Sequence, residues 1–175
     1  MFKGLKWQIV IVTVAVMLGL LIGGFNLYQN RILPGKIAKD ISTVKYVKST
    51  TIDIGDNGYV ANIKLARTNN IMETYRSIEK KINKYPVKIE IKIFDNSNAK
   101  LNNIYYEDQF AIYQAIQNGD YIKMNEIVNK NGNNQSVKSH IYIDENNIYL
   151  IIEDGPNYLY KIIPRSLTKG EKPNG

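Results

Sequence analysis

The sequence predicts an α+β protein carried by a single N-terminal transmembrane helix. Two observations lead to this expectation. The first is an uncharged apolar run near the start, and the second is a later change in the period of the apolar residues, from two residues, typical of strands, to 3.6 residues, typical of helices, and back to two. The expected order after the anchor is ββαβααβββ, with strands grouped at both ends of a helical middle. This grouping favours an antiparallel sheet with helices packed on one face. The 175 residues leave room for one small domain beyond the anchor.

The expected anchor is segment 7–25, which reads WQIVIVTVAVMLGLLIGGF and holds no charged residue. As a helix it would extend about 28 Å, close to the thickness of the hydrocarbon core of a bilayer. Trp7 at one end and Tyr28 just beyond the other are typical of aromatic anchors at membrane interfaces. A cleaved signal peptide is the alternative. The apolar stretch exceeds its usual core of about 7–15 residues and no A-x-A-like site follows, so an uncleaved signal anchor is favoured.

The basic N-terminus sets the expected orientation. Residues 1–6 contain Lys3 and Lys6 and no acid, so they are expected to form a short cytoplasmic tail. The C-terminal domain is then expected outside the cytoplasm, because long domains translocate largely regardless of their charge. A cytoplasm-facing domain stays open as an alternative. It is favoured by the basic residues that follow the apolar run, namely Arg31, Lys36, Lys39 and Lys45.

Small residues recur along one side of the expected anchor. Ala15, Gly19 and Gly23 are four residues apart, and such spacing lets two helix backbones approach closely in lipid. A homodimer through this face is one interpretation. The other is that glycine and alanine are simply frequent in membrane helices.

Segment 26–45 is expected to be a juxtamembrane connector. The anchor helix should end at Leu33, because Pro34-Gly35 follows and proline cannot continue the hydrogen-bond ladder. The folded domain is expected to cover 46–164. The polar tail 165–175 contains glycine and proline and is expected to be disordered.

The first half of the domain reads as a hairpin, a helix and a strand. Alternating segments 50–54 and 59–65 flank the turn Gly55–Gly58. Apolar residues at helical spacing follow over 71–85, where Asn70 is a suitable N-terminal cap with Glu73 three residues on. Pro86 ends that pattern. Residues 87–93 then alternate aliphatic and charged side chains, which predicts a strand with one solvated face.

The second half reads as two helices and a three-stranded meander. The first helix should run through Tyr106 and Phe110 to Gly119, which can form a left-handed cap. Asp120 can cap a second helix that Asn131–Asn134 should break. Strands are expected at 137–143, 148–153 and 158–163. The middle one is almost entirely apolar, so we expect it at the centre with both faces covered.

This part of the chain resembles a known family. The stretch Ile93-Phe94-Asp95-Asn96, with Tyr105-Tyr106, Ala115-Ile116, Gly119 and Met124, is similar to a family of small, uncharacterised, N-terminally anchored proteins of endospore-forming bacteria. The resemblance would cover most of the chain after the anchor. It implies a bacterial envelope protein, and it implies no activity and no catalytic residues.

Composition excludes several kinds of site. The chain has no cysteine and one histidine, so disulfides, thiolate nucleophiles and Cys-based zinc sites are excluded, and no cofactor or metal is expected. No Walker, GxSxG or HExxH motif occurs. Segment 53–58 lacks the ligand spacing of a calcium loop and is better read as a turn. His140 is expected to be a solvated residue of its strand.

The chain is basic, with a net charge of +7. A basic surface can bind anionic lipid, anionic wall polymers or nucleic acid. The lysines are spread out, however, and the richness in Ile, Lys, Asn and Tyr is what A/T-rich codons produce. A generic solvated surface is therefore favoured, and nucleic acid is not the expected partner.

Pairs of adjacent acidic residues are the candidate catalytic residues if the protein is an enzyme. Paired carboxylates can hydrolyse or transfer glycosidic bonds, so an envelope hydrolase or transferase acting on wall polymer is an alternative function. Adjacent residues point in different directions, which argues against convergence on one substrate. The pairs are Glu107-Asp108, Asp144-Glu145 and Glu153-Asp154.

Tyrosine is unusually common, with 13 residues against four phenylalanines. Tyr142, Tyr149, Tyr158 and Tyr160 lie in the terminal meander and form a possible binding face, since tyrosine gives a large contact area at low entropy cost. Composition bias is the competing explanation. The expected function is a non-enzymatic, membrane-anchored envelope protein that binds an envelope protein or wall polymer, or that assembles with itself.

Overall fold

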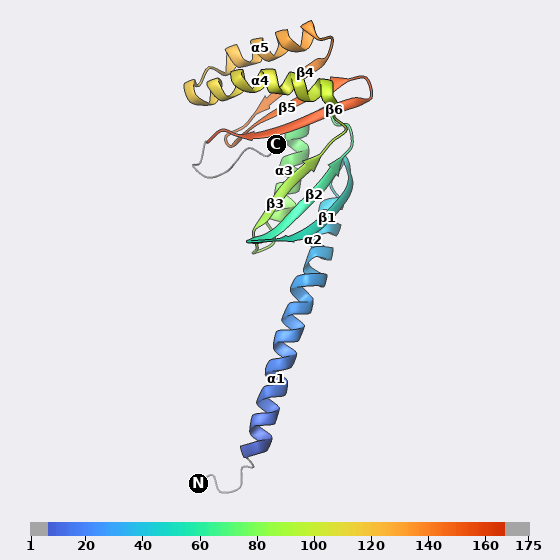
Figure 1. Ribbon diagram of the computed structural model, residues 1–175, viewed down its shortest axis with the longest axis vertical. Helices are drawn as coiled ribbons and strands as arrows, with labels where there is room; N and C mark the ends of the chain where they lie inside the picture. Colours follow the sequence, from blue (N-terminus) through green and yellow to red (C-terminus); the bar gives the residue numbers. More distant parts are fainter. Residues whose placement is uncertain (1–6, 167–175) are drawn as a thin grey trace.

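The computed structural model describes residues 7–166 (Figure 1). The expected cytoplasmic tail 1–6 and most of the expected disordered tail 165–175 lie outside the described residues. Figure 1 shows a long helix that carries a domain at its C-terminal end. The α+β class predicted from the sequence is confirmed, and the predicted order ββαβααβββ is observed from residue 47 onward.

The N-terminal helix is continuous through three segments. These are α1 (Trp7–Leu27), the π-helical turn η1 (Tyr28–Ile32) and α2 (Leu33–Ser42). The expected end of the helix at Pro34-Gly35 is wrong. Proline would clash with the carbonyl four residues earlier in a regular α-helix, but here the ladder is wider, since the Leu33 N–H donates to the Tyr28 carbonyl five residues back. Pro34 then falls in the first turn of α2, where its missing N–H costs little.

The two ends of this helix have different surroundings. The stretch Ile9–Ser42 is, among the described residues, the one helix long and apolar enough to cross a membrane, and its most apolar window is not buried. In α2, by contrast, Leu33, Ile37 and Ile41 are buried in the core of the domain. The segment expected to be a connector therefore contains a helix of the folded domain.

The first sheet contains β1 (Val47–Gly55), β2 (Gly58–Leu65) and β3 (Ile89–Phe94), in that order. β1 and β2 form the predicted antiparallel hairpin. β3 pairs with β2 in parallel, not antiparallel as expected, because α3 (Ile71–Ile82) carries the chain back to the end where β2 began. Gly58 permits this pairing: its φ is 141°, and a Cβ there would lie 2.3 Å from the Lys88 carbonyl oxygen.

The second sheet is the predicted meander of β4 (Lys138–Ile143), β5 (Asn147–Asp154) and β6 (Asn157–Pro164), with β5 in the centre. Helices α4 (Ala99–Asn118) and α5 (Tyr121–Asn134) cover one face (Figure 1). Helix α5 does not break at Asn131 as expected. It continues because Gly132 packs against β4, where an added Cβ would lie 2.7 Å from the Ser139 Oγ.

Strand β5 separates two apolar cores. Tyr149 and Ile151 face the core shared with α2, α3 and the first sheet, and Ile148, Leu150 and Ile152 face α4 and α5. The expectation that both faces of this strand are covered is confirmed. The described residues thus form two three-stranded sheets where one was expected, linked by an antiparallel bridge between Asn96 and Tyr158.

Candidate functional site

The expected membrane anchors lie at the two ends of the exposed helix. The side chains of Trp7 and Tyr28 are both exposed. The Lys36 Nζ lies over the Tyr28 ring, 5.7 Å from its centroid. The lysine and the tyrosine therefore form a cation–π pair just beyond the apolar span, the position at which interfacial aromatic residues are expected.

The small-residue face of α1 is open. Ala15, Gly19 and Gly23 are exposed, and a Cβ added at either glycine would meet nothing within 4 Å. No part of the described chain fills this face. Its role in a homodimer stays a prediction.

The expected tyrosine binding face does not form. Tyr149, Tyr158 and Tyr160 are buried, because their side of the meander is covered by the first sheet and α3. Tyr158 donates to the Leu65 carbonyl at 2.9 Å, and the Tyr160 hydroxyl accepts from the Thr68 N–H at 2.7 Å.

These hydroxyls join the second sheet to the segment that follows β2. Tyr142 is the member of the set that stays partly exposed, and its hydroxyl donates to the Asn69 carbonyl at 2.7 Å. The tyrosines of the meander therefore hold the two halves of the domain together.

Two of the three acid pairs do not converge. Glu153 accepts from Arg67 at 2.7 Å and Asp154 from Lys100 at 2.9 Å. Glu107 accepts from Gln135 at 3.0 Å, while its neighbour Asp108 is buried. The members of these two pairs point to different partners, as the sequence argument anticipated, whereas Asp144 and Glu145 both line one groove. His140 is exposed on β4, as expected.

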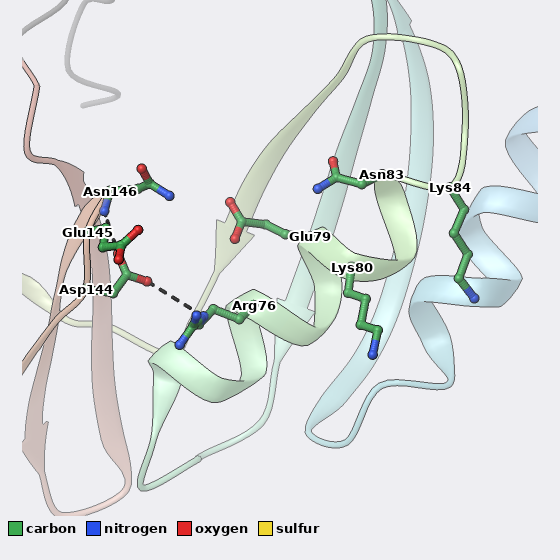
Figure 2. Close-up of a pocket in the computed structure, with 8 residues that line it drawn as sticks. All are labelled: Arg76, Glu79, Lys80, Asn83, Lys84, Asp144, Glu145 and Asn146. Atoms are coloured by element: carbon green, nitrogen blue, oxygen red, sulfur yellow. Dashed lines mark hydrogen bonds and ion pairs between the residues drawn. The ribbon is translucent and has the colours of Figure 1, made fainter.

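A groove that the sequence did not reveal lies between α3 and the turn that joins β4 to β5 (Figure 2). Its volume is about 800 Å³. On the helix side, Arg76 and Lys80 are four residues apart in α3 and therefore share one face, and Lys84 follows just after the helix ends. The full lining is Arg76, Glu79, Lys80, Asn83, Lys84, Asp144, Glu145 and Asn146.

Asp144 closes the turn. One carboxylate oxygen accepts from the backbone N–H groups of Asn146 and Asn147 at 2.9 and 2.8 Å, and the other accepts from the Tyr149 hydroxyl at 2.8 Å. Burial alone would raise the pKa of Asp144, but these hydrogen bonds and the nearby Arg76 guanidinium together lower it. Both carboxylate oxygens of Asp144 are therefore already engaged in hydrogen bonds within the protein.

Glu79 is the other notable acid of the groove. Burial raises the pKa of Glu79, and the negative charge of Asp144 raises it further. Arg76 partly offsets both effects. Because the groove contains three basic and three acidic side chains, it has no overall preference for ligands of one charge.

An exposed aromatic pair lies on α4, in the layer farthest from α1 (Figure 1). The rings of Tyr106 and Phe110 meet edge to face with centroids 5.8 Å apart, and the two residues are 63% and 64% exposed. The spacing of four residues was visible in the sequence. That this side of the helix faces away from the core could not be inferred, since Tyr105 and Tyr113 offered an equally apolar side.

The described residues contain no cluster of His, Asp and Glu suited to a metal ion. Comparisons of the chain with protein-family models, with curated proteins and with solved structures each gave no match.

Proposed function

We propose that this protein is a single-pass bacterial envelope protein that holds a non-enzymatic α+β domain outside the cytoplasm and presents it to a partner. One observation carries the proposal: a continuous helix whose apolar first part is fully exposed and whose last turns are buried in the domain. An apolar surface of this length is stable in lipid and not in water. The basic residues Lys3 and Lys6 before it favour a cytoplasmic N-terminus.

The aromatic pair is the proposed contact surface. Tyr106 and Phe110 project from the layer farthest from the anchor, where a second protein can reach them. Exposed aromatic residues that stack on each other offer a large apolar area with few rotamers to fix on binding. The partner is an envelope protein or a second copy of this chain.

Topology is tested with a cysteine, since the natural chain has none. The variant Ser166→Cys places a thiol at an exposed position after β6. Labelling of intact cells by a membrane-impermeant maleimide supports an external domain. Labelling only after the cells are opened contradicts it and favours a cytoplasmic domain that meets anionic lipid or nucleic acid, whose binding would depend strongly on salt.

The contact surface is tested by photo-crosslinking in cells. A photoreactive amino acid replaces Phe110, and the matched control carries it at the exposed Asn129 of α5. A discrete adduct at position 110 and none at position 129 supports the surface. An adduct of twice the monomer mass identifies a second copy as the partner, and equal crosslinking at both positions contradicts the proposal.

A wall-polymer hydrolase or transferase is the second candidate. The observation that favours it is the pair of acids in the groove, since the pKa of Glu79 is raised while that of Asp144 is lowered. Against it, the Asp144 carboxylate is already occupied by hydrogen bonds. Release of reducing ends or peptides from purified wall polymer by the full chain, abolished in Glu79→Gln, would favour the enzyme.

A further inference from the structure

The folded domain begins close to the point where the helix leaves its apolar span. Between Leu27, the last residue of α1, and Leu33, the first buried residue of α2, lie only the five residues of η1. No flexible linker separates the two. A bilayer that surrounds α1 would therefore meet the underside of the domain.

The β1–β2 hairpin is tied to this junction. The Tyr59 hydroxyl donates to the Gln29 carbonyl at 2.9 Å and also contacts the Gln29 side-chain oxygen. Gln29 is about 3 Å along the axis from Leu27, which is within a lipid headgroup layer of about 5–7 Å. Figure 1 shows the hairpin turn at the end of the first sheet that lies toward α1.

One apolar side chain at this place is left largely uncovered by the described part of the chain. Ile54 lies directly opposite Tyr59 in the hairpin and so shares its face of the sheet, yet Ile54 is 61% exposed. Ile32, in η1, is also exposed. The exposure of these two side chains is explained if lipid covers them.

The charges around this surface favour an anionic bilayer. Arg31 is exposed in η1, the Lys36 ammonium folds down over the Tyr28 ring, and Lys88 lies beside the hairpin turn at Gly58. Asp56 in the turn and Asp53 in β1, which accepts from the Asn62 side chain at 2.7 Å, are the acids of the hairpin. Basic residues close to a membrane surface each contribute about 1 kcal/mol of attraction to anionic lipid.

We infer that the β1–β2 hairpin, through Ile54 with Arg31, Lys36 and Lys88 around it, docks on anionic phospholipid headgroups beside the anchor. The inference rests on the proposed membrane anchor. It adds a second point of contact, which fixes the tilt of the domain against the bilayer. The occupant of this surface is the membrane that α1 spans.

The test measures how close the hairpin lies to the headgroups. Ile54→Cys in the full chain carries a bimane fluorophore, and the protein is reconstituted in vesicles of phosphatidylglycerol and phosphatidylcholine with a nitroxide quencher on the headgroup. The matched control is Ile122→Cys, on α5, where the native side chain is 78% exposed at the far end of the domain. Asn57→Cys, exposed in the turn, replaces Ile54→Cys if that variant does not fold.

Strong quenching at position 54 or 57 and none at position 122 is the expected result. Arg31→Gln combined with Lys88→Gln should reduce this quenching, whereas Lys130→Gln with Lys138→Gln, two exposed lysines of the other half, should not. Equal quenching at positions 54 and 122 in protein that floats with the vesicles overturns the docking while the anchor stands. Protein that does not float with the vesicles overturns the anchor and the docking together. Unchanged quenching in purely zwitterionic vesicles overturns the role of the charges.

Discussion

The Asp108 carboxyl is buried between α4 and α5, where its Oδ1 accepts a hydrogen bond of 2.8 Å from the Asn131 side chain. Its Oδ2 is buried with no hydrogen-bond partner among the described residues. Burial raises the pKa of Asp108 from its ordinary 3.8 to about 6, and the charge of Glu107 adds to this, while the Asn131 hydrogen bond opposes it. The protein therefore retains a destabilising charge at neutral pH.

Asp108→Asn is expected to stabilise the protein at pH 7.5 by about 2 kcal/mol, because the amide keeps the shape and carries no buried charge. Chemical denaturation measures the free energy of unfolding. Glu126→Gln, an exposed acid of α5, is the control and should change it little. A destabilised Asp108→Asn variant would contradict this account.

The same residue predicts a pH dependence. Between about pH 4 and pH 6 the folded protein holds a proton on Asp108 that the unfolded chain has lost, so stability falls as pH rises through this range. The stability gained by Asp108→Asn should therefore shrink toward zero as pH falls from 7 to 4. If the stability gained by Asp108→Asn does not change with pH, the stabilisation comes from packing and not from removal of the buried charge.

Asp144→Ala is expected to destabilise the protein by about 1–3 kcal/mol, because two backbone N–H groups and the Tyr149 hydroxyl lose their acceptor. Glu145→Ala changes the exposed neighbour and should have little effect. Thermal unfolding of the two variants makes the comparison.

The lowered pKa of Asp144 gives the opposite pH behaviour to that of Asp108. Its stabilisation is present above the pKa of the unfolded chain and is lost as pH falls through the folded pKa. The difference between wild type and Asp144→Ala should consequently narrow in strong acid. A constant difference down to pH 2 would be inconsistent with a charged Asp144 in the fold.

Tyr160→Phe is expected to cost about 1–3 kcal/mol, since the buried Thr68 N–H loses its 2.7 Å partner. Tyr142→Phe removes a hydroxyl whose hydrogen bond to the Asn69 carbonyl is also 2.7 Å long. Tyr142 is partly exposed, so water can replace its hydroxyl and the loss of stability should be smaller. If both variants lose the same stability, the buried hydroxyl has no special role in joining the two halves.

Gly58→Ala is expected to be strongly destabilising, by about 2 kcal/mol or more, because φ is positive and the added Cβ would meet the Lys88 carbonyl. Gly155→Ala is the matched control. Its φ is also positive, at 56°, but a Cβ there meets nothing within 4 Å, so only about 1 kcal/mol is expected. Equal unfolding midpoints for the two variants would contradict the close approach of β3.

The sequence was most informative where the signal is local. Asn70 and Asp120 cap their helices through the backbone N–H three residues on, and Gly119 adopts the left-handed conformation, all as predicted. The apolar run of β5 correctly predicted a strand covered on both faces. Local chemistry determines caps and turns, so these features can be read from a few residues.

The predictions that were wrong concern contacts between residues far apart in the sequence. Alternation in residues 87–93 indicates a strand but not its direction relative to β2, so the parallel pairing was missed. The tyrosine face failed for a related reason. Tyr160 lies opposite Ile151 in the register and shares its covered face, so the burial of β5 on both sides already implied a buried Tyr160.

The candidate groove could not be predicted because about 60 residues separate its two sides, Arg76–Lys84 and Asp144–Asn146. The four-residue spacing of Arg76, Lys80 and Lys84, the last of them just beyond α3, was its one local sign. Pro34 was misread because a rule for regular α-helices was applied where the backbone has a π-helical turn.

That turn also sets the azimuth of the domain around the anchor. One residue more or fewer in an α-helix rotates everything beyond it by about 100°. A π-helical turn takes up one more residue than an α-helical turn. If Tyr28–Ile32 returned to regular α-helical bonding with no residue removed, the aromatic pair and the hairpin would therefore rotate by about a quarter turn around the helix axis relative to Ala15, Gly19 and Gly23, with every side chain of both surfaces unchanged. In a dimer formed through that small-residue face, surfaces that faced each other across the dimer axis would then point sideways, past each other.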